Sequence, residues 1–144
     1  FYAGIMGIML YTGLGDRLGE VMASIATLET YPFFAYLIGG IVNFAIPSAG
    51  GEFAVIGPSL INAITEIGVG LPQEKITAMI ARASLSTAYG ESLSNMLQPF
   101  YLLIVMPIMG NGVKLQARDI MGYLVIPFLI FFIIQSLLIV YWPL

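Results

Sequence analysis

Two stretches of this sequence carry side chains that could bind an ion or a small polar molecule. The first is Ile46–Glu52, IPSAGGE, and the second is Ser84–Phe100, SLSTAYGESLSNMLQPF. Each combines hydroxyl, amide or carboxyl oxygens with Gly and Pro, the residues that interrupt helices. Carbonyl and side-chain oxygens at such a break coordinate hard cations, and the N–H groups at the next helix start bind anions. The pattern therefore predicts ion binding.

The composition excludes several other kinds of chemistry. The chain has 144 residues, of which 59% are hydrophobic and 9% charged, whereas soluble domains carry about 25% charged residues. It contains no Cys and no His, which excludes disulfides, thiol chemistry, His-ligated metals and His-based triads. The net charge is −3 and the sequence has no basic patch, so we expect no nucleic-acid partner. We predict a multi-pass protein of the cytoplasmic (inner) membrane, in contact with the lipid bilayer.

Apolar helices must then hold the polar stretches at membrane depth. Non-helical backbone persists there only where protein buries it or where it lines a wet cavity, and pairs of broken helices form transporter sites. We predict an all-α integral membrane fold in one domain. Its segments are the end of a transmembrane helix at 1–14, an interfacial helix at 16–28, a re-entrant hairpin at 29–67, an interrupted transmembrane helix at 75–109 and a transmembrane helix at 119–142.

The hairpin is predicted from two apolar arms around a Pro/Gly tip. Pro47 stops the first arm, and Gly50 and Gly51 permit backbone that other residues avoid. The second arm should therefore start near Phe53. For 29–67, the alternative is one full span followed by a half-span.

The interrupted helix should unwind from about Tyr89 to Gln98, and Pro99 should open the helix that follows. Ile120–Val140 is the clearest transmembrane run. Lys114 and Arg118 place the loop before it on the cytoplasmic side, because cytoplasmic loops are enriched in basic residues.

The N-terminal part differs from the rest. Residues 1–14 are apolar but fewer than the roughly 20 that a spanning helix needs, so we expect the N-terminal half of the protein to be missing here. Apolar residues at helical spacing alternate with polar ones over 16–28, which is typical of an interfacial amphipathic helix. An ordinary connecting helix packed on protein is the alternative for this segment.

Three segments resemble the AtoE-type short-chain fatty acid transporters: IPSAGGEFAVIGPSLI, AYGESLSNMLQPF and ARDIMGY. They follow one another in the same order and spacing over 48–123, roughly half of the chain. The family pattern has Gln at Glu52 and Asp at Glu91. The resemblance implies uptake of short-chain monocarboxylates such as acetoacetate or butyrate with a coupling cation, Na⁺ or H⁺. The similar wider ion-transporter group implies an inverted-repeat fold, of which this chain would be one half.

Candidate site residues follow from the two breaks and from the carboxylate that the resemblance implies. Arg82 is included because a guanidinium binds a carboxylate through paired hydrogen bonds. Buried carboxyl groups in a membrane are costly and are commonly functional. The predicted substrate-binding residues are Ser48, Gly50, Gly51, Glu52, Ser94, Asn95 and Arg82, and the predicted cation-coupling residues are Glu91, Ser92, Ser94 and Asn95.

Other functions remain open at this point. A related carboxylate or anion transporter of the wider group is the main alternative. An intramembrane enzyme would need Glu52 and Glu91 within a few ångströms of each other beside a substrate cleft, and a channel subunit would show a continuous polar stripe. We predict a transporter and not an enzyme. Its expected partners are a small monocarboxylate, the missing N-terminal half of its own chain and, as an open question, further copies of itself.

Overall fold

The computed structural model describes residues 4, 7–8, 11–110, 112, 114 and 116–142, without the side chains of residues 15, 16, 18, 19, 22 and 23. Every element in this part of the chain is helical, which confirms the all-α prediction for it. Half of the residues in the helix end predicted at 1–14 lie outside the described residues. The elements are α2 (Leu14–Ile25), α3 (Tyr31–Asn43), α4 (Ala49–Ile67), α5 (Gln73–Ser94), the 3-10 turn η1 (Asn95–Leu97), α6 (Pro99–Met109) and α7 (Ala117–Tyr141).

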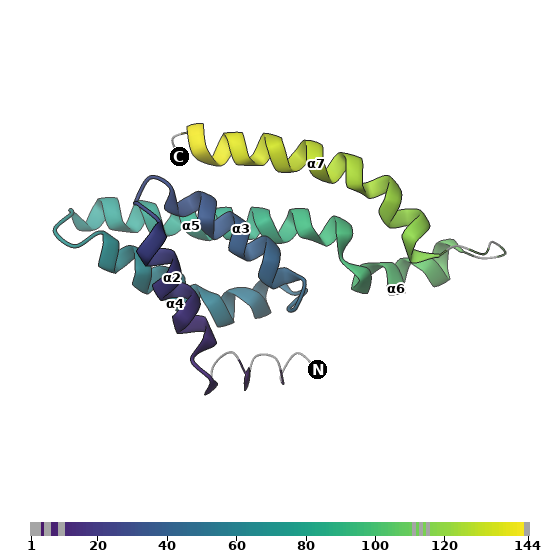
Figure 1. Ribbon diagram of the computed structural model, residues 1–144, viewed down its shortest axis with the longest axis horizontal. Helices are drawn as coiled ribbons and strands as arrows, with labels where there is room; N and C mark the ends of the chain where they lie inside the picture. The colour runs from purple at the N-terminus through teal and green to yellow at the C-terminus, as the bar shows by residue number, and fades with distance from the viewer. Residues whose placement is uncertain are drawn as a thin grey trace.

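Among the described helices, α7 alone has the length and apolar composition to cross a membrane unaided. Its 25 residues extend about 37 Å, more than the roughly 30 Å of hydrocarbon in a bilayer. Gln116 and Asp119 form a capping box at its start. All of α7 is described, and Ile139 is its single buried residue. Figure 1 shows this helix, in yellow, running back along α5. So apolar and exposed a helix fits the lipid environment predicted for 119–142.

The interrupted helix is present, but its break is shorter than predicted. The helix α5 ends in η1, and α6 leaves at an angle of 48° after Gln98. The expected unwinding of 89–98 was wrong for most of that range. The hydroxyls of Ser86 and Thr87 donate to carbonyls one turn back in α5, at 2.9 and 3.0 Å, and thus leave the helix intact. The break itself is made by Pro99, which disfavours helical backbone at the residue before it.

Glycines bring α3 and α5 unusually close together. A Cβ atom at Gly39 would lie 2.6 Å from the carbonyl oxygen of Thr87, and one at Gly90 would overlap the carbonyl oxygen of Tyr36. Neither position has room for a side chain. Small residues let membrane helices approach in this way. The contact holds Asn43, the last residue of α3, against the C-terminal end of α5.

The helix α4 begins earlier than the sequence predicted. Ser48 is its N-cap, and the Ser48 hydroxyl accepts a hydrogen bond from the Gly51 backbone N–H at 3.4 Å. Gly50 and Gly51 therefore lie in the first helical turn, and neither has a positive φ. The expectation of a glycine tip was wrong because a Ser N-cap and the acidic Glu52 both stabilise a helix start here. The re-entrant hairpin at 29–67 stays a prediction.

A hydrophobic core lies between α3, α4 and α5. Ile56, Leu60 and Ile64 of α4 pack there with Ala35 of α3 and Ala83 of α5. The buried Tyr31 hydroxyl donates to the Leu60 carbonyl oxygen at 2.9 Å. This core fixes α4 beside α5.

The helix predicted at 16–28 appears as α2, which ends three residues earlier, at Ile25. A turn at Thr27–Thr30 follows it, held by hydrogen bonds between the two threonines. The helix α2 packs along α4, as expected for the alternative of a connecting helix packed on protein. Its position at a membrane interface stays a prediction.

Candidate functional site

A buried cluster of oxygen atoms lies where the ends of α3 and α5 meet. The amide nitrogen Nδ2 of Asn43 donates to Ser94 Oγ at 2.7 Å, to Asn95 Oδ1 at 2.6 Å and to the Glu91 carbonyl oxygen at 3.2 Å. We call these three acceptors the oxygen cluster. Asn43 is 1% exposed. An amide nitrogen has only two hydrogens, and the Glu91 carbonyl oxygen also accepts from the Ser94 hydroxyl at 3.0 Å and from the Asn95 backbone N–H.

Gln98 ties this cluster to the break in the helix. Its Nε2 donates to the Asn43 carbonyl oxygen at 2.8 Å, and its Oε1 accepts from the Phe100 backbone N–H at 3.5 Å. The side chain therefore links the end of α3 with the start of α6, across the bend. These two contacts connect the residue that binds the oxygen cluster, Asn43, with the bend between α5 and α6.

Two carboxyl groups face each other next to this cluster. Glu52, in the first turn of α4, is 0% exposed, and Glu91, in α5, is 4% exposed. Their side chains are close enough to interact electrostatically. Two ionised carboxylates have only acceptors to offer, and accordingly both oxygens of Glu52 and Oε1 of Glu91 lack a partner. One shared proton would give the pair a donor and remove one buried charge. The two glutamates are called the carboxyl pair below.

No basic side chain neutralises the carboxyl pair within the described part of the chain. The ion pairs found there are Arg17–Glu20 at 3.5 Å and Arg118–Asp119 at 3.9 Å, and both are exposed. Glu52 has instead the N-terminal end of α4, whose partial positive charge favours a carboxylate. The pair therefore depends on a proton or a cation for full compensation.

The structure brings together only some of the predicted site residues. Glu52, Glu91, Ser94 and Asn95 meet at the centre. Of the others, Ser48 and Gly50 are exposed at the start of α4, Gly51 is half-buried beside them, and Ser92 is exposed on α5.

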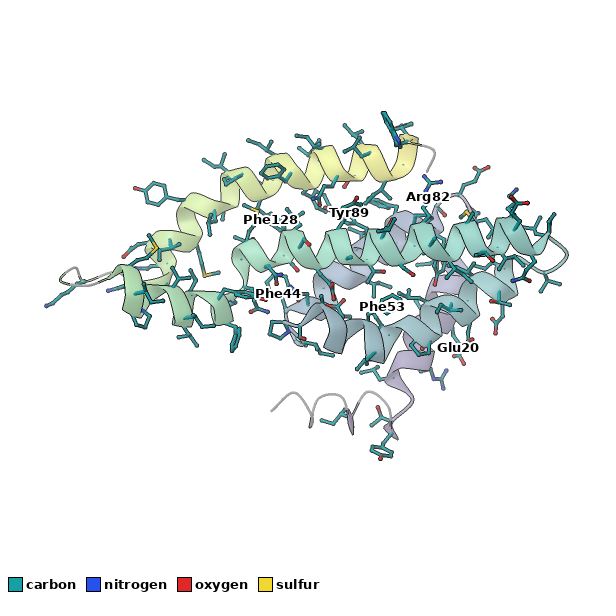
Figure 2. All side chains as sticks on the ribbon, turned by 180° about the vertical axis from the view of Figure 1, so that it is seen from behind. Glu20, Phe44, Phe53, Arg82, Tyr89 and Phe128 are labelled. Carbon is teal, nitrogen blue, oxygen red and sulfur yellow. The ribbon has the colours of Figure 1, made fainter. Side chains whose placement is uncertain are left out.

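Arg82 lies elsewhere. It precedes Ser94 by about three turns of α5, or roughly 18 Å along the helix axis. Its Nη2 donates to the carbonyl oxygens of Ile139 at 2.6 Å and Trp142 at 3.3 Å, so it caps the C-terminal end of α7. Figure 2 shows Arg82 and Tyr89 on the side of α5 that faces α7. The predicted substrate-binding set is thus divided between two places.

Asn43 was missed as a site residue. The sequence did contain a signal, since Asn43 is an amide side chain in an apolar run, three residues after Gly40. Polar residues in membrane helices commonly face a partner helix or a site. What the sequence lacked was its partner, because Ser94 lies 51 positions further along the chain.

Comparison with known proteins identifies the family. The family model described as "Short chain fatty acid transporter" matches residues 1–142. The chain belongs to the short-chain fatty acid transporter family. It is 37% identical over 123 residues to the "Putative short-chain fatty acid transporter" of Escherichia coli K12 and 35% identical over 123 residues to the protein of the same name from Haemophilus influenzae. Each match covers 85% of this chain and 25% of the relative. No solved structure matches the chain.

Family membership confirms the resemblance seen in the sequence and agrees with a transporter and not an enzyme. The chain spans about a quarter of the length of these curated relatives. The enzyme alternative required that Glu52 and Glu91 meet beside a substrate cleft. They do meet, but neither carboxyl group lines the cavity of about 490 Å³ between α5 and α7 or the one of about 130 Å³ between α3, α5 and α7.

Proposed function

We propose that the full-length protein is a secondary transporter, which moves short-chain fatty acids of the acetoacetate or butyrate class across the cytoplasmic membrane with a coupling cation. The observation that carries this proposal is the buried polar centre formed by the oxygen cluster and the carboxyl pair. It lies where α3 ends, α4 begins and α5 breaks. Discontinuous helices that surround buried oxygens are the usual ion sites of secondary transporters.

The oxygen cluster is suited to Na⁺. Its three oxygens converge on Asn43 Nδ2 at 2.6–3.2 Å, so the amide N–H group occupies the place that a cation would take. Rotation of the Asn43 amide by about half a turn exchanges its nitrogen for its oxygen. Four oxygens then face one another, and a hard cation, which prefers oxygen ligands of this kind, binds between them once the amide has drawn back to admit it. Ser92, which is exposed, takes no part in this site.

The carboxyl pair is suited to a proton and gives a second candidate for the coupling ion. Glu91 belongs to both features, since its backbone carbonyl is in the oxygen cluster while its side chain is in the carboxyl pair. The positive charge of a cation at the oxygen cluster would therefore oppose the binding of a proton at the carboxyl pair, since both sites include Glu91. Coupling by Na⁺ is favoured here, because its ligands already converge and only one amide has to turn.

We also propose how these helices are arranged in the membrane, on the model of transporters with discontinuous helices. The helices α3 and α4 form the re-entrant hairpin, α5 with α6 forms a broken span, and the remainder of the full-length protein supplies the inverted repeat. A broken span is supported by the bend of 48° between two helices that together are long and apolar enough to cross. Ser48, Gly50 and Gly51, at the accessible start of α4, remain candidates for contact with the substrate.

Transport by the full-length protein in proteoliposomes tests this function. Labelled butyrate and acetoacetate should accumulate when a Na⁺ gradient is imposed at constant pH, and longer or doubly charged acids should compete poorly. Accumulation driven by a pH gradient without Na⁺ would instead identify the carboxyl pair as the site of the coupling ion. Transport of dicarboxylates or inorganic anions in place of butyrate would favour a related anion transporter of the wider group. Failure to move any monocarboxylate under either gradient would refute the proposal.

A further inference from the structure

A cavity lies between α5 and α7, away from the polar centre. The cavity has a volume of about 490 Å³, within the range of about 300–1,000 Å³ that is typical of small-molecule sites. Arg82, Ser86 and Tyr89 of α5 contribute its polar wall. Ile134 and Leu138 of α7 contribute an apolar wall opposite them, with the amide of Gln135 between.

Arg82 supplies an anion-binding group at one end of this cavity. Its Nη2 is engaged with the end of α7, but its Nε is buried and has no hydrogen-bond partner. A guanidinium has five N–H donors, so several remain for a ligand. No carboxylate pairs with Arg82 within the described part of the chain. The group is therefore a half-buried positive charge that lacks a protein anion.

Gln135 supplies a second unfilled polar position. Its Oε1 is buried without a hydrogen-bond partner although α7 is otherwise strongly apolar. A glutamine amide can donate through its nitrogen or accept through its oxygen. With Arg82 it gives the cavity two residues whose buried polar atoms lack partners, on a mainly apolar surface, and a few polar groups among apolar ones are the general form of a site that orients one small ligand.

We propose that this cavity binds the monocarboxylate substrate, with the carboxylate on Arg82 and the acyl chain against Ile134 and Leu138. The inference rests on the proposed transport function and gives that function a substrate site. It separates the substrate from the coupling ion by about three turns of α5, which are roughly 18 Å long. Arg82 binds the carboxylate through its positive charge and through the N–H groups on Nε and Nη1, which the contacts of Nη2 with α7 leave available.

The shared chemistry is an anionic head on an apolar tail, and a lipid of the bilayer also has that chemistry. The two sources differ in a way that can be measured. A soluble carboxylate competes with labelled butyrate in a concentration-dependent manner in any vesicle. A lipid-occupied site instead responds to the content of anionic lipid and ignores the soluble acid.

The first test is butyrate uptake by full-length variants in proteoliposomes. We expect Arg82→Gln to raise the KM for butyrate at least tenfold and Arg82→Lys to raise it less, since lysine keeps the positive charge but lacks the Nε–H donor. Arg17→Gln is the matched control, because this substitution removes the same charge from an exposed position on α2. Wild-type uptake combined with an unchanged KM in both Arg82 variants would overturn the site but not the transport function. Absence of wild-type uptake would instead refute the transport function.

The second test does not depend on turnover and guards against misfolding of the Arg82 variants. Gln135→Cys is introduced into full-length protein that has no other cysteine, and its labelling by a small maleimide is timed. Butyrate should slow labelling several-fold, whereas butanol, which has the tail but no charge, should not. Equal effects of butyrate and butanol, or protection that follows anionic lipid and not butyrate, would overturn the assignment of the cavity to the substrate.

Discussion

Replacing Asn43 with Asp tests whether the oxygen cluster is a cation site or a structural contact, because the two roles predict opposite dependences on Na⁺. Without Na⁺, the substitution removes the N–H donor and places a carboxylate against three acceptor oxygens. The two hydrogen bonds that the amide can make at one time stabilise the fold by about 1–3 kcal/mol in total, at 0.5–1.5 kcal/mol each. Repulsion between the oxygens adds to that loss.

With Na⁺ the expected result reverses. The added carboxylate oxygen is then a further ligand with a full charge, so Asn43→Asp should bind Na⁺ more tightly than the wild type. A ligand present at about 100 times its Kd stabilises the folded state by about 2.7 kcal/mol, which is enough to offset most of the loss. The variant should therefore unfold at a much lower temperature in choline chloride and recover in NaCl.

The assay is thermal unfolding of full-length protein in detergent, with NaCl and choline chloride compared at equal ionic strength. Asn62→Asp is the control, because Asn62 is exposed on α4 and undergoes the same change of charge. Equal destabilisation of Asn43→Asp in both salts, with no effect of Na⁺ on the wild type, would show that the cluster is only a structural contact.

Three further predictions concern helix packing, the carboxyl pair and topology. Gly90→Ala should destabilise the protein by about 1–3 kcal/mol, since a Cβ atom there would overlap α3. Gly50→Ala should be neutral, because a Cβ atom at Gly50 would have no atom within 4 Å. Equal thermal unfolding of the two variants would contradict this packing. Under proton coupling, Glu91→Gln should abolish accumulation driven by a pH gradient while counter-exchange of butyrate continues, and unaltered accumulation would exclude the pair as the proton site. Cysteines at Ser24 and Val69, both exposed, should be labelled from one side of the membrane; labelling from opposite sides would replace the hairpin by a full span.

Local chemistry explains the parts that the sequence predicted correctly. Ile120–Val140 is almost entirely apolar, with Gln135 and Ser136 as its polar exceptions, and a run of that length and composition favours a helix. Pro99 removes a helical N–H and restricts the residue before it, so the position of the bend followed from the chain alone. The family also followed from the sequence, since three motifs in order and spacing, around Gly51, Glu91 and Asp119, together carried the resemblance.

The sequence failed where one local pattern has two outcomes. The serines and threonine of 84–94 suggested unwound backbone, but hydroxyls that bond to carbonyls one turn back leave a helix intact. Gly50 and Gly51 suggested a turn, yet a Ser48 cap makes them the first turn of α4. In both cases the outcome depends on what surrounds the segment, because burial decides whether a polar group must find its partner within its own helix.

Tertiary structure alone decided which residues meet. Contacts between helices depend on their crossing and rotation, and here these are fixed by glycines that leave no room for a side chain between α3 and α5. That packing joins Asn43 to Ser94 and Asn95, and the core beneath it places α4 so that Glu52 reaches Glu91. Sequence composition predicted a membrane protein that carries polar groups within its apolar helices. Which of those groups share a site was settled only by the close approach of helices that lie some 50 residues apart in the chain.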